Sequence, residues 1–202
     1  DWSSDVCSSD LDATIENDFT HAGGVIDCDG NTLELEADVT LSGGTFAATG
    51  DVELTGSSGT QTITSNSNTF KNLTINCDGA TVQLADNMDV DGTLTYMAGA
   101  VDLQSYNINS SGGITNSAAI PFIISGTGKV ILDGASQSLS GPLSFPALEC
   151  TTAGATITFD AGDYFEFDTL TLTGTSGNDI NLRSSSSGTQ YYFCVSSETL
   201  SY

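Results

Sequence analysis

The 202-residue sequence predicts an all-β fold, and within that class a parallel β-helix (β-solenoid) in which short strands stack coil upon coil. Three observations support this prediction: strand-like alternation of apolar and polar residues, regularly spaced turn residues, and a long internal repeat. No helical stripe of useful length occurs in the chain. A β-sandwich is the alternative, because strand spacing alone suits a sandwich or a barrel equally well.

Alternation with a period of two begins after residue 12. Aliphatic residues alternate with Thr, Glu or Asn, as a half-buried strand requires. The clearest strand segments are 32–36, 39–41, 51–55, 72–76, 81–84, 93–96 and 169–173. Turn residues rich in Gly, Ser and Asp punctuate the chain. These turns lie at 42–44, 56–59, 78–79, 91–92, 111–113 and 174–177.

A decayed internal repeat covers about residues 49–114 and again about residues 127–182. TGDVELTG at 49–56 returns as TGKVILDG at 127–134, and GATV at 79–82 returns as GATI at 154–157. A period that drifts but persists is typical of stacked units that bury their apolar faces against neighbours. With coils of roughly 20 to 30 residues, one repeat is about three coils and residues 12–202 form a single solenoid of about seven to nine coils. The lack of regular hexapeptides favours a right-handed solenoid.

Strand parity predicts which residues point into the solenoid. In the first copy of the repeat they are Val52, Leu54, Ile63, Leu73, Ile75, Val82, Leu84, Leu94 and Leu103. In the second copy they are Val130, Leu132, Leu139, Leu148, Cys150, Ile157, Phe159 and Leu170.

Both ends of the sequence are unusual. Residues 1–11 share nothing with the rest and resemble a translated sequencing adaptor, so Trp2 and Cys7 are set aside; a Ser/Asp-rich linker is the alternative. No polar capping unit follows the last strand before Tyr202, although repeat proteins need such units. We therefore expect an internal fragment of a longer protein, truncated at both ends.

Charge limits the classes of partner. The chain has 26 acidic residues against three basic ones, for a net charge of −23. That field repels nucleic acid and anionic membrane surfaces. No apolar run reaches the ~20 residues of a membrane-spanning helix, so no membrane insertion is expected in this segment.

Four cysteines remain after residue 11: Cys28, Cys77, Cys150 and Cys194. Their spacing fits no zinc motif. Cys150 aligns with the inward Ile75 of the first copy, which favours buried free thiols that pack as small hydrophobic residues. The alternative is a disulfide bond, formed in an oxidising compartment, and the sequence does not choose among the three possible pairings.

The motif F-x-N-L-T-I-x-x-x-G-x-T-V at 70–82, followed by the unit at 86–95, resembles the arrays of large bacterial secreted and cell-surface proteins. Those arrays form pectate-lyase-like or haemagglutinin/autotransporter-like right-handed β-helices, and the resemblance covers most of residues 30–195. It implies an extracellular or cell-surface location and an adhesin-like role.

Enzymes on such solenoids use two kinds of site. Lyases need a cationic base beside calcium-held carboxylates, but none of Lys71, Lys129 and Arg183 lies near an Asp cluster in the sequence. Lys71 is expected on a solvated strand face, and Arg183 is expected to pair with a surface carboxylate. Hydrolases use paired carboxylates. The candidates are Asp86, Asp89 and Asp91 in the first copy and Asp160, Asp163 and Asp168 in the second; turn formation by Asp is the alternative.

Calcium is the one cofactor that the sequence suggests. Asp86, Asp89 and Asp91, and separately the segment 27–30 (DCDG), bring hard oxygen ligands close together in sequence. Neither matches an EF-hand loop or a calcium-binding nonapeptide repeat.

Two further groups of residues have alternative interpretations. His21 precedes Ala-Gly-Gly and is expected to be a surface turn residue. Tyr191, Tyr192 and Phe193 could form a sugar-stacking patch, but strand alternation instead sends Tyr192 to one face and its neighbours to the other.

Together these observations favour a non-enzymatic, structural or adhesin-like solenoid segment of a larger secreted or cell-surface protein. The alternative is a carbohydrate-active enzyme or carbohydrate-binding module on the same scaffold. Expected partners are extracellular polysaccharide, surface proteins, or further repeats of the same polypeptide.

Overall fold

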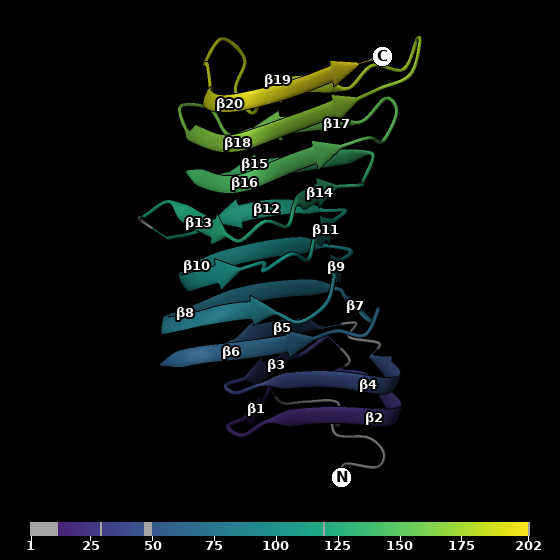
Figure 1. The fold of residues 1–202 in the computed structure, drawn as a ribbon, viewed down its shortest axis with the longest axis vertical. Coiled ribbons are helices and arrows are strands. Elements are labelled where there is room, and N and C mark those ends of the chain that lie inside the picture. The colour runs from purple at the N-terminus through teal and green to yellow at the C-terminus, as the bar shows by residue number, and fades with distance from the viewer. Residues whose placement is uncertain (1–11, 29, 47–49, 119, 202) are drawn as a thin grey trace.

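The computed structural model describes residues 12–201 except 29, 47–49 and 119, and in these residues it contains twenty strands and no helix (Figure 1). All pairings between these strands are parallel. The strands stack as a β-solenoid of about 8 turns, with β1 (Ala13–Ile15) at one end and β20 (Tyr192–Ser201) at the other. The predicted parallel β-helix is confirmed and the β-sandwich, which is antiparallel, is excluded. The right-handed sense stays a prediction.

The strands form three stacks, which we name in chain order. The first stack contains β1 (Ala13–Ile15), β3 (Thr32–Leu35), β5 (Asp51–Leu54), the first half of β8 (Asn72–Leu84), the first half of β10 (Thr93–Asp102), β12 (Gly113–Asn116), β15 (Ser136–Ser140), β17 (Thr156–Phe159) and β19 (Asn181–Ser184).

The second and third stacks follow the same order along the solenoid. The second contains β2 (Phe19–Ile26), β4 (Val39–Phe46), β6 (Gly59–Thr64), the second halves of β8 and β10, β13 (Phe122–Ser125), and the first halves of β16 (Leu143–Cys150), β18 (Tyr164–Thr173) and β20 (Tyr192–Ser201). The third contains β7 (Thr69–Phe70), β9 (Met88–Val90), β11 (Ile108–Ser110), β14 (Val130–Leu132) and the second halves of β16, β18 and β20.

The core is a set of apolar ladders between the three stacks. Every residue that strand parity placed inside, from Val52 to Leu103 and from Val130 to Leu170, is buried. In the first stack, Leu33, Val52, Leu73, Leu94, Ile114 and Leu139 occupy one register position in successive coils. Alternation along each strand thus produces one continuous hydrophobic interior.

Corners join the stacks, and some corners lie within strands. The predicted turn at 78–79 is a corner inside β8, where Gly79 has a φ of +89°. Gly99 makes the equivalent corner inside β10 with a φ of +99°. Such positive φ values suit glycine, which has no Cβ to clash with the following carbonyl. The chain therefore bends inside a continuous strand at these glycines.

The repeat does not correspond to a whole number of coils. Register partners in adjacent coils lie between 18 and 28 residues apart. The partners of Val52 in later coils are Leu73, Leu94, Ile114 and Leu139, whereas its repeat equivalent, Val130, lies in the third stack. The repeat is thus more than three coils and less than four. Thr49, the first residue of the repeat, and residues 1–11 lie outside the described residues.

Candidate functional site

Asp86 holds the turn at residues 65–67 of the preceding coil by hydrogen bonds. Its Oδ1 accepts hydrogen bonds from the backbone N of Ser65 at 2.8 Å and from the Oγ of Ser65 at 3.1 Å, and its Oδ2 accepts one from the backbone N of Asn66. The clamped turn contains two non-glycine residues with positive φ, Asn66 at 48° and Ser67 at 63°. A carboxylate with both oxygens bound to the neighbouring coil stabilises this strained turn.

Asp89 and Asp91 are directed to the outer side of the third stack. Asp89 accepts a hydrogen bond from Thr69 Oγ1 at 3.1 Å. Burial raises the pKa of the Asp89 carboxyl; the Thr69 hydrogen bond opposes this, and the charges of Asp133 and Asp91 add to it. The fold therefore brings Asp89 near Asp133 of a later coil, a residue that sequence spacing did not include.

In the described residues this arrangement provides no cluster of ligands for calcium. Among the described residues, no three His, Cys, Asp or Glu side chains lie close enough to hold a metal ion together. Asp86 is directed to the turn at residues 65–66, away from a shared site with Asp89 and Asp91. In the second candidate segment, 27–30, Asp29 lies outside the described residues. Calcium binding stays a prediction.

The acidic residues of the second copy also connect coils. Asp160 accepts hydrogen bonds from Ser140 Oγ at 3.0 Å and Ser185 Oγ at 2.7 Å, and so links three successive coils. The hydrogen bond from Ser185 lowers the pKa of Asp160. Asp163 accepts a hydrogen bond from the backbone N of Gly141 at 3.0 Å. The hydrogen bonds to Asp160 stabilise its ionised carboxylate, which is the opposite of what a general acid requires.

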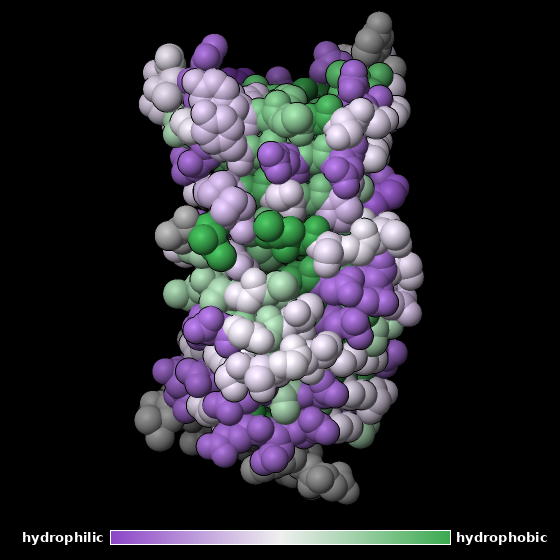
Figure 2. All heavy atoms as spheres, turned by 60° about the vertical axis from the view of Figure 1, so that its left-hand side comes forward, coloured by the Kyte–Doolittle hydropathy of each residue, from purple (hydrophilic) through white to green (hydrophobic). Residues whose placement is uncertain are grey.

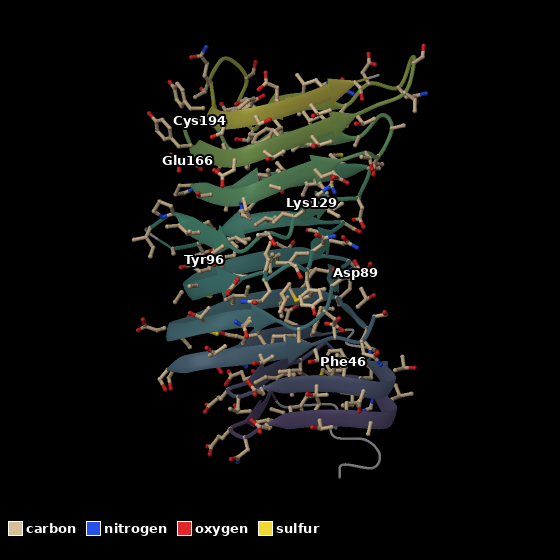
Figure 3. All side chains as sticks on the ribbon, in the orientation of Figure 1. Phe46, Asp89, Tyr96, Lys129, Glu166 and Cys194 are labelled. Atoms are coloured by element: carbon tan, nitrogen blue, oxygen red, sulfur yellow. The ribbon has the colours of Figure 1, made fainter. Side chains whose placement is uncertain are left out.

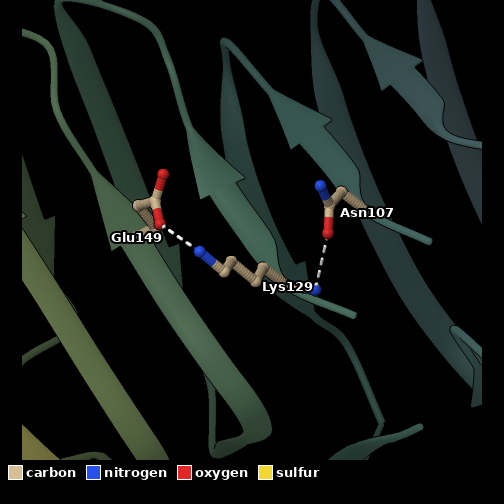
Figure 4. A network of polar contacts seen from close by, with 3 residues as sticks. All are labelled: Asn107, Lys129 and Glu149. Carbon is tan, nitrogen blue, oxygen red and sulfur yellow. Dashed lines mark hydrogen bonds and ion pairs between the residues drawn. The ribbon is translucent and has the colours of Figure 1, made fainter. Parts of the chain in front are cut away.

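The three basic residues have different surroundings. Lys129 Nζ pairs with Glu149 Oε2 at 2.7 Å, and the Lys129 backbone N donates to Asn107 Oδ1 at 3.0 Å (Figure 4). Lys71 is exposed as expected, but it lies in the bend between β7 and β8 instead of on a strand. Arg183 is exposed on β19 and forms no ion pair among the described residues, so its expected pairing is wrong.

His21 is buried, which corrects the expectation of a surface turn. It is 3% exposed in β2, and its Nε2 has no hydrogen-bond partner among the described residues. Gly44 of the next coil leaves room for the ring: a Cβ there would lie 2.6 Å from His21 Nε2. The sequence contained the signal, because His21 has the same strand parity as the inward Phe19.

Two buried glutamines were missed by the sequence reasoning. Gln61 donates from Nε2 to the backbone O of Leu35 at 2.8 Å and of Ala37 at 2.7 Å, and its Oε1 accepts from the backbone N of Gly56 at 3.3 Å. Its repeat equivalent, Gln137, donates from Nε2 to the backbone O of Ser110 at 2.9 Å. Both satisfy backbone groups at a corner. Their parity with Ile63 and Leu139 could have identified them as inward residues.

Cys28, Cys77 and Cys150 are buried, as expected, and Cys77 and Cys150 are free thiols. Burial raises the pKa of the Cys77 thiol to about 11. Cys194 is exposed, which corrects the expectation for this residue, because it lies over the outward Glu166 of β18 in the register between β18 and β20.

An exposed strip of aromatic and polar residues runs along the outer side of the last two coils. It comprises Tyr164, Glu166 and Asp168 on β18 and Tyr192, Cys194 and Ser196 on β20, and we call it the aromatic–acidic strip. The rings of Tyr164 and Tyr192 stack with centroids 4.9 Å apart and planes at 17°. Figure 3 places Glu166 and Cys194 on the opposite side of the solenoid from Asp89.

The aromatic run at residues 191–193 divides only in part as strand alternation predicts. Tyr192 belongs to the strip, whereas Tyr191 stacks on the buried Phe159 with ring centroids 4.6 Å apart. Phe193 also contacts Phe159, with centroids 5.9 Å apart. Phe193 is nevertheless 41% exposed, against 47% for Tyr192, so it does not pack as a buried core residue.

The strip borders a hollow of about 250 Å³. Its lining residues are Ser144, Phe145, Glu166, Phe167, Asp168, Cys194 and Ser196. Carboxylate and hydroxyl oxygens beside exposed aromatic rings are suited to a polyhydroxylated ligand, whose C–H faces pack on rings and whose hydroxyls donate to carboxylates. This is the side of the molecule that comes forward in Figure 2, where the upper coils carry mixed polar and apolar surface.

No helix in the described residues is long and apolar enough to cross a membrane. Comparisons with protein-family models, with curated proteins and with solved structures gave no match.

Proposed function

We propose that this chain is a non-enzymatic, structural and adhesin-like solenoid segment of a larger secreted or cell-surface bacterial protein. The observation that carries the proposal is the use of outward polar side chains as links between coils. Asp86 and Asp160 act in this way, as does Asn107, which accepts from Lys129 and whose backbone N donates to Asn87 Oδ1 at 2.9 Å.

These links support a rigid extended element. Apolar ladders inside, parallel backbone pairing along three stacks and side-chain bonds outside all act in the direction of the solenoid axis. The large negative charge favours solubility of an exposed surface. The motif at 70–82, with its likeness to secreted and surface arrays, agrees with an extracellular setting.

The test combines binding and turnover on the same polymers. The purified chain is incubated with insoluble neutral and acidic polysaccharides, and bound protein, reducing ends and unsaturated sugar products are measured. We expect retention on a polymer without any product. Product formation by the wild type that disappears in an Asp89→Asn, Asp91→Asn double variant would overturn the non-enzymatic proposal in favour of a carbohydrate-active enzyme.

Carbohydrate binding is a second candidate function, favoured by the stacked Tyr164 and Tyr192. The net charge of −23 disfavours anionic polymers, so the ligand class is a neutral oligosaccharide. In calorimetric titration with β-1,4-linked glucose and mannose hexasaccharides, Tyr192→Ala should weaken binding by about tenfold. Tyr192→Phe keeps the ring and should retain binding, and Met97→Ala, which alters an exposed apolar residue on β10, serves as the control. Equal affinity of Tyr192→Ala and the wild type would reject this site.

A further inference from the structure

Four exposed apolar residues gather on the outer side of the second stack, in the middle of the solenoid. Ile120 and Pro121 precede β13, and Ile123 lies on β13; Ile120 is 59% and Ile123 is 60% exposed. Ala100 of β10, also exposed, precedes the register partner of Ile124 and so lies beside Ile123. We call Ala100, Ile120, Pro121 and Ile123 the β13 patch, and Figure 2 shows hydrophobic side chains gathered at mid-height on this side. Contiguous apolar surface of this kind marks an interaction site, and coils on both sides of β13 leave it open.

The segment that carries the β13 patch is fixed by buried side chains. Asn116, which is buried, donates from Nδ2 to the backbone O of Ile120 at 2.8 Å and to the backbone O of Pro142 at 2.7 Å. The buried ring of Phe122 stacks on the buried ring of Tyr96, with centroids 4.1 Å apart. A partner would therefore meet a preorganised surface, which lowers the entropy cost of binding.

The charges around the β13 patch are negative. Glu166 lies in the same outward column as Ile123, because Ile123 pairs with Ser144 and Ser144 pairs with Glu166. At ~4.8 Å for each coil, Glu166 and Ile123 are about 10 Å apart. On the other side of the patch, Asp102 of the preceding coil pairs with Ser125 of β13. Neither carboxylate forms an ion pair among the described residues. The basic residues of the chain lie away from the second stack: Lys71 in the bend between β7 and β8, Lys129 directly before β14, and Arg183 on β19.

We propose that the β13 patch binds a basic segment of another protein, one that carries aliphatic side chains between Arg or Lys residues. The aliphatic side chains pack on Ile120 and Ile123, and the cations approach Glu166 and Asp102. A second copy of this chain does not fit, because it would bring carboxylates against carboxylates. A sugar does not fit either, because branched aliphatic side chains offer no flat ring to its C–H faces. The inference rests on the proposed adhesin-like role only in naming a class of partner for it, and it needs no carbohydrate binding.

The test measures binding of the capped, fluorescently labelled peptide RRSLSLSRR to the purified chain by fluorescence anisotropy. We expect saturable binding that needs both the leucines and the arginines of the peptide. The peptide RRSSSSSRR, which lacks Leu, and the peptide EESLSLSEE, which lacks Arg, should each bind more weakly by about tenfold. Ile123→Ser should weaken binding of the first peptide by about tenfold, and Glu166→Gln should weaken it by about threefold.

The matched controls are Val25→Ser and Asp89→Asn. Val25 is 55% exposed, much like Ile123, but it lies on β2 in the first described coil, and Asp89 lies on the opposite side of the solenoid from Glu166 (Figure 3). Both variants should bind RRSLSLSRR as the wild type does, and circular dichroism checks that every variant keeps its β structure.

Three results would each overturn the proposal: no binding by the wild type, equal binding of the peptide that lacks Leu, or equal weakening by Asp89→Asn and Glu166→Gln. The last two would show attraction by the net charge of −23 alone. None of them alters retention on polysaccharides, which tests the proposed function, so the two proposals fail separately.

Discussion

The two copies of the repeat have equivalent sequences but lie on different faces of the solenoid. Val52 is in the first stack and Val130 in the third; Phe70 is in the third stack and Phe145 in the second. The three stacks follow one another cyclically around the solenoid. In this cyclic order, each strand of the second copy lies one stack before its counterpart, so the first stack is replaced by the third and the third by the second. The repeat therefore specifies a strand, a corner and the next strand, and it does not specify a face.

The corners that contain Gln61 and Gln137 show how far this equivalence extends. In each, a glutamine side chain lies beside a glycine, Gly56 in the first copy and Gly134 in the second. Gln61 has partners at both ends of its amide, whereas Gln137 Oε1 has none among the described residues. The same local motif is thus well satisfied on one face and only partly satisfied on another, because the neighbouring coil differs.

The largest expected difference between the copies is at the corner glycines. A Cβ on Gly134 would lie 2.1 Å from the backbone O of Ser111, whereas a Cβ on Gly56 would meet the Gln61 Oε1 at 2.9 Å. A backbone atom cannot move as easily as a side-chain end. We expect Gly134→Ala to lower the free energy of unfolding by about 3 kcal/mol and Gly56→Ala by about 1 kcal/mol, as measured by urea denaturation.

Gly23→Ala is the control for this pair, because an added Cβ would meet no atom within 4 Å there. It should change the free energy of unfolding little. If Gly56→Ala proved as destabilising as Gly134→Ala, the two corners would be equally tight, and the difference drawn between the copies would be wrong.

The glutamines should differ by a smaller amount. Gln61→Leu leaves the carbonyl of Ala37 and the amide of Gly56 without these partners and removes one of the two hydrogen bonds to the Leu35 carbonyl, which should destabilise the fold by about 2 kcal/mol. Gln137→Leu loses one bond but also removes the unpartnered Oε1, so the net change should stay within about 1 kcal/mol. Thermal and urea unfolding of both variants measure this, with the exposed Gln190→Leu as control. Equal losses in Gln61→Leu and Gln137→Leu would contradict the contrast.

The remaining expected difference between the copies is a pH dependence in the first copy. Cys77 Sγ donates to Gln61 Oε1 at 3.4 Å and to the backbone O of Leu54 at 3.2 Å, and the second copy has Thr152 at its position. Burial raises the pKa of Cys77 from 9.0 to about 11. The folded state therefore favours the thiol, and the stability that this gives is complete below pH 9 and is lost as the pH rises towards 11.

Within that window the loss from Cys77 should approach about 1.4 kcal/mol per pH unit. Cys77→Thr, which installs the residue of the second copy, should make the free energy of unfolding fall less steeply with pH, as measured by urea titrations from pH 8 to pH 11. Cys150 retains its own contribution in both proteins, because burial also raises its pKa. Parallel slopes for the wild type and the variant would show that Cys77 does not titrate in this way.

Much of the fold could be predicted because strand parity is a local property. The interior position of Val52, Leu132 or Phe159 follows from a period of two along each strand, and the structure confirms all of them. His21 escaped the same reasoning because the glycines after it suggested a turn, although its parity with Phe19 pointed inward. Cys194 escaped because only its register with Glu166 decides which side of β20 faces out.

The candidate sites could be predicted only in part. Asp89 and Asp91 do share a surface, but Asp133, which influences Asp89, comes from a later coil. Asp86 is nearby in sequence yet is directed to the turn at residue 65. The aromatic–acidic strip combines residues of β18 and β20 whose register partners lie 28 residues apart, so spacing in the sequence could not reveal it.

The sequence by itself determined the all-β class, the stacked architecture, the inward residues and the chemistry of the corners. The tertiary structure decided which stack each strand joins, which coil each side chain meets and which polar groups find partners. The physical reason is that alternation and turn preference act over a few residues, whereas the position of a strand on the solenoid depends on the summed length of every corner and strand before it. An insertion of a few residues leaves the pattern of each strand intact and still moves it to another face.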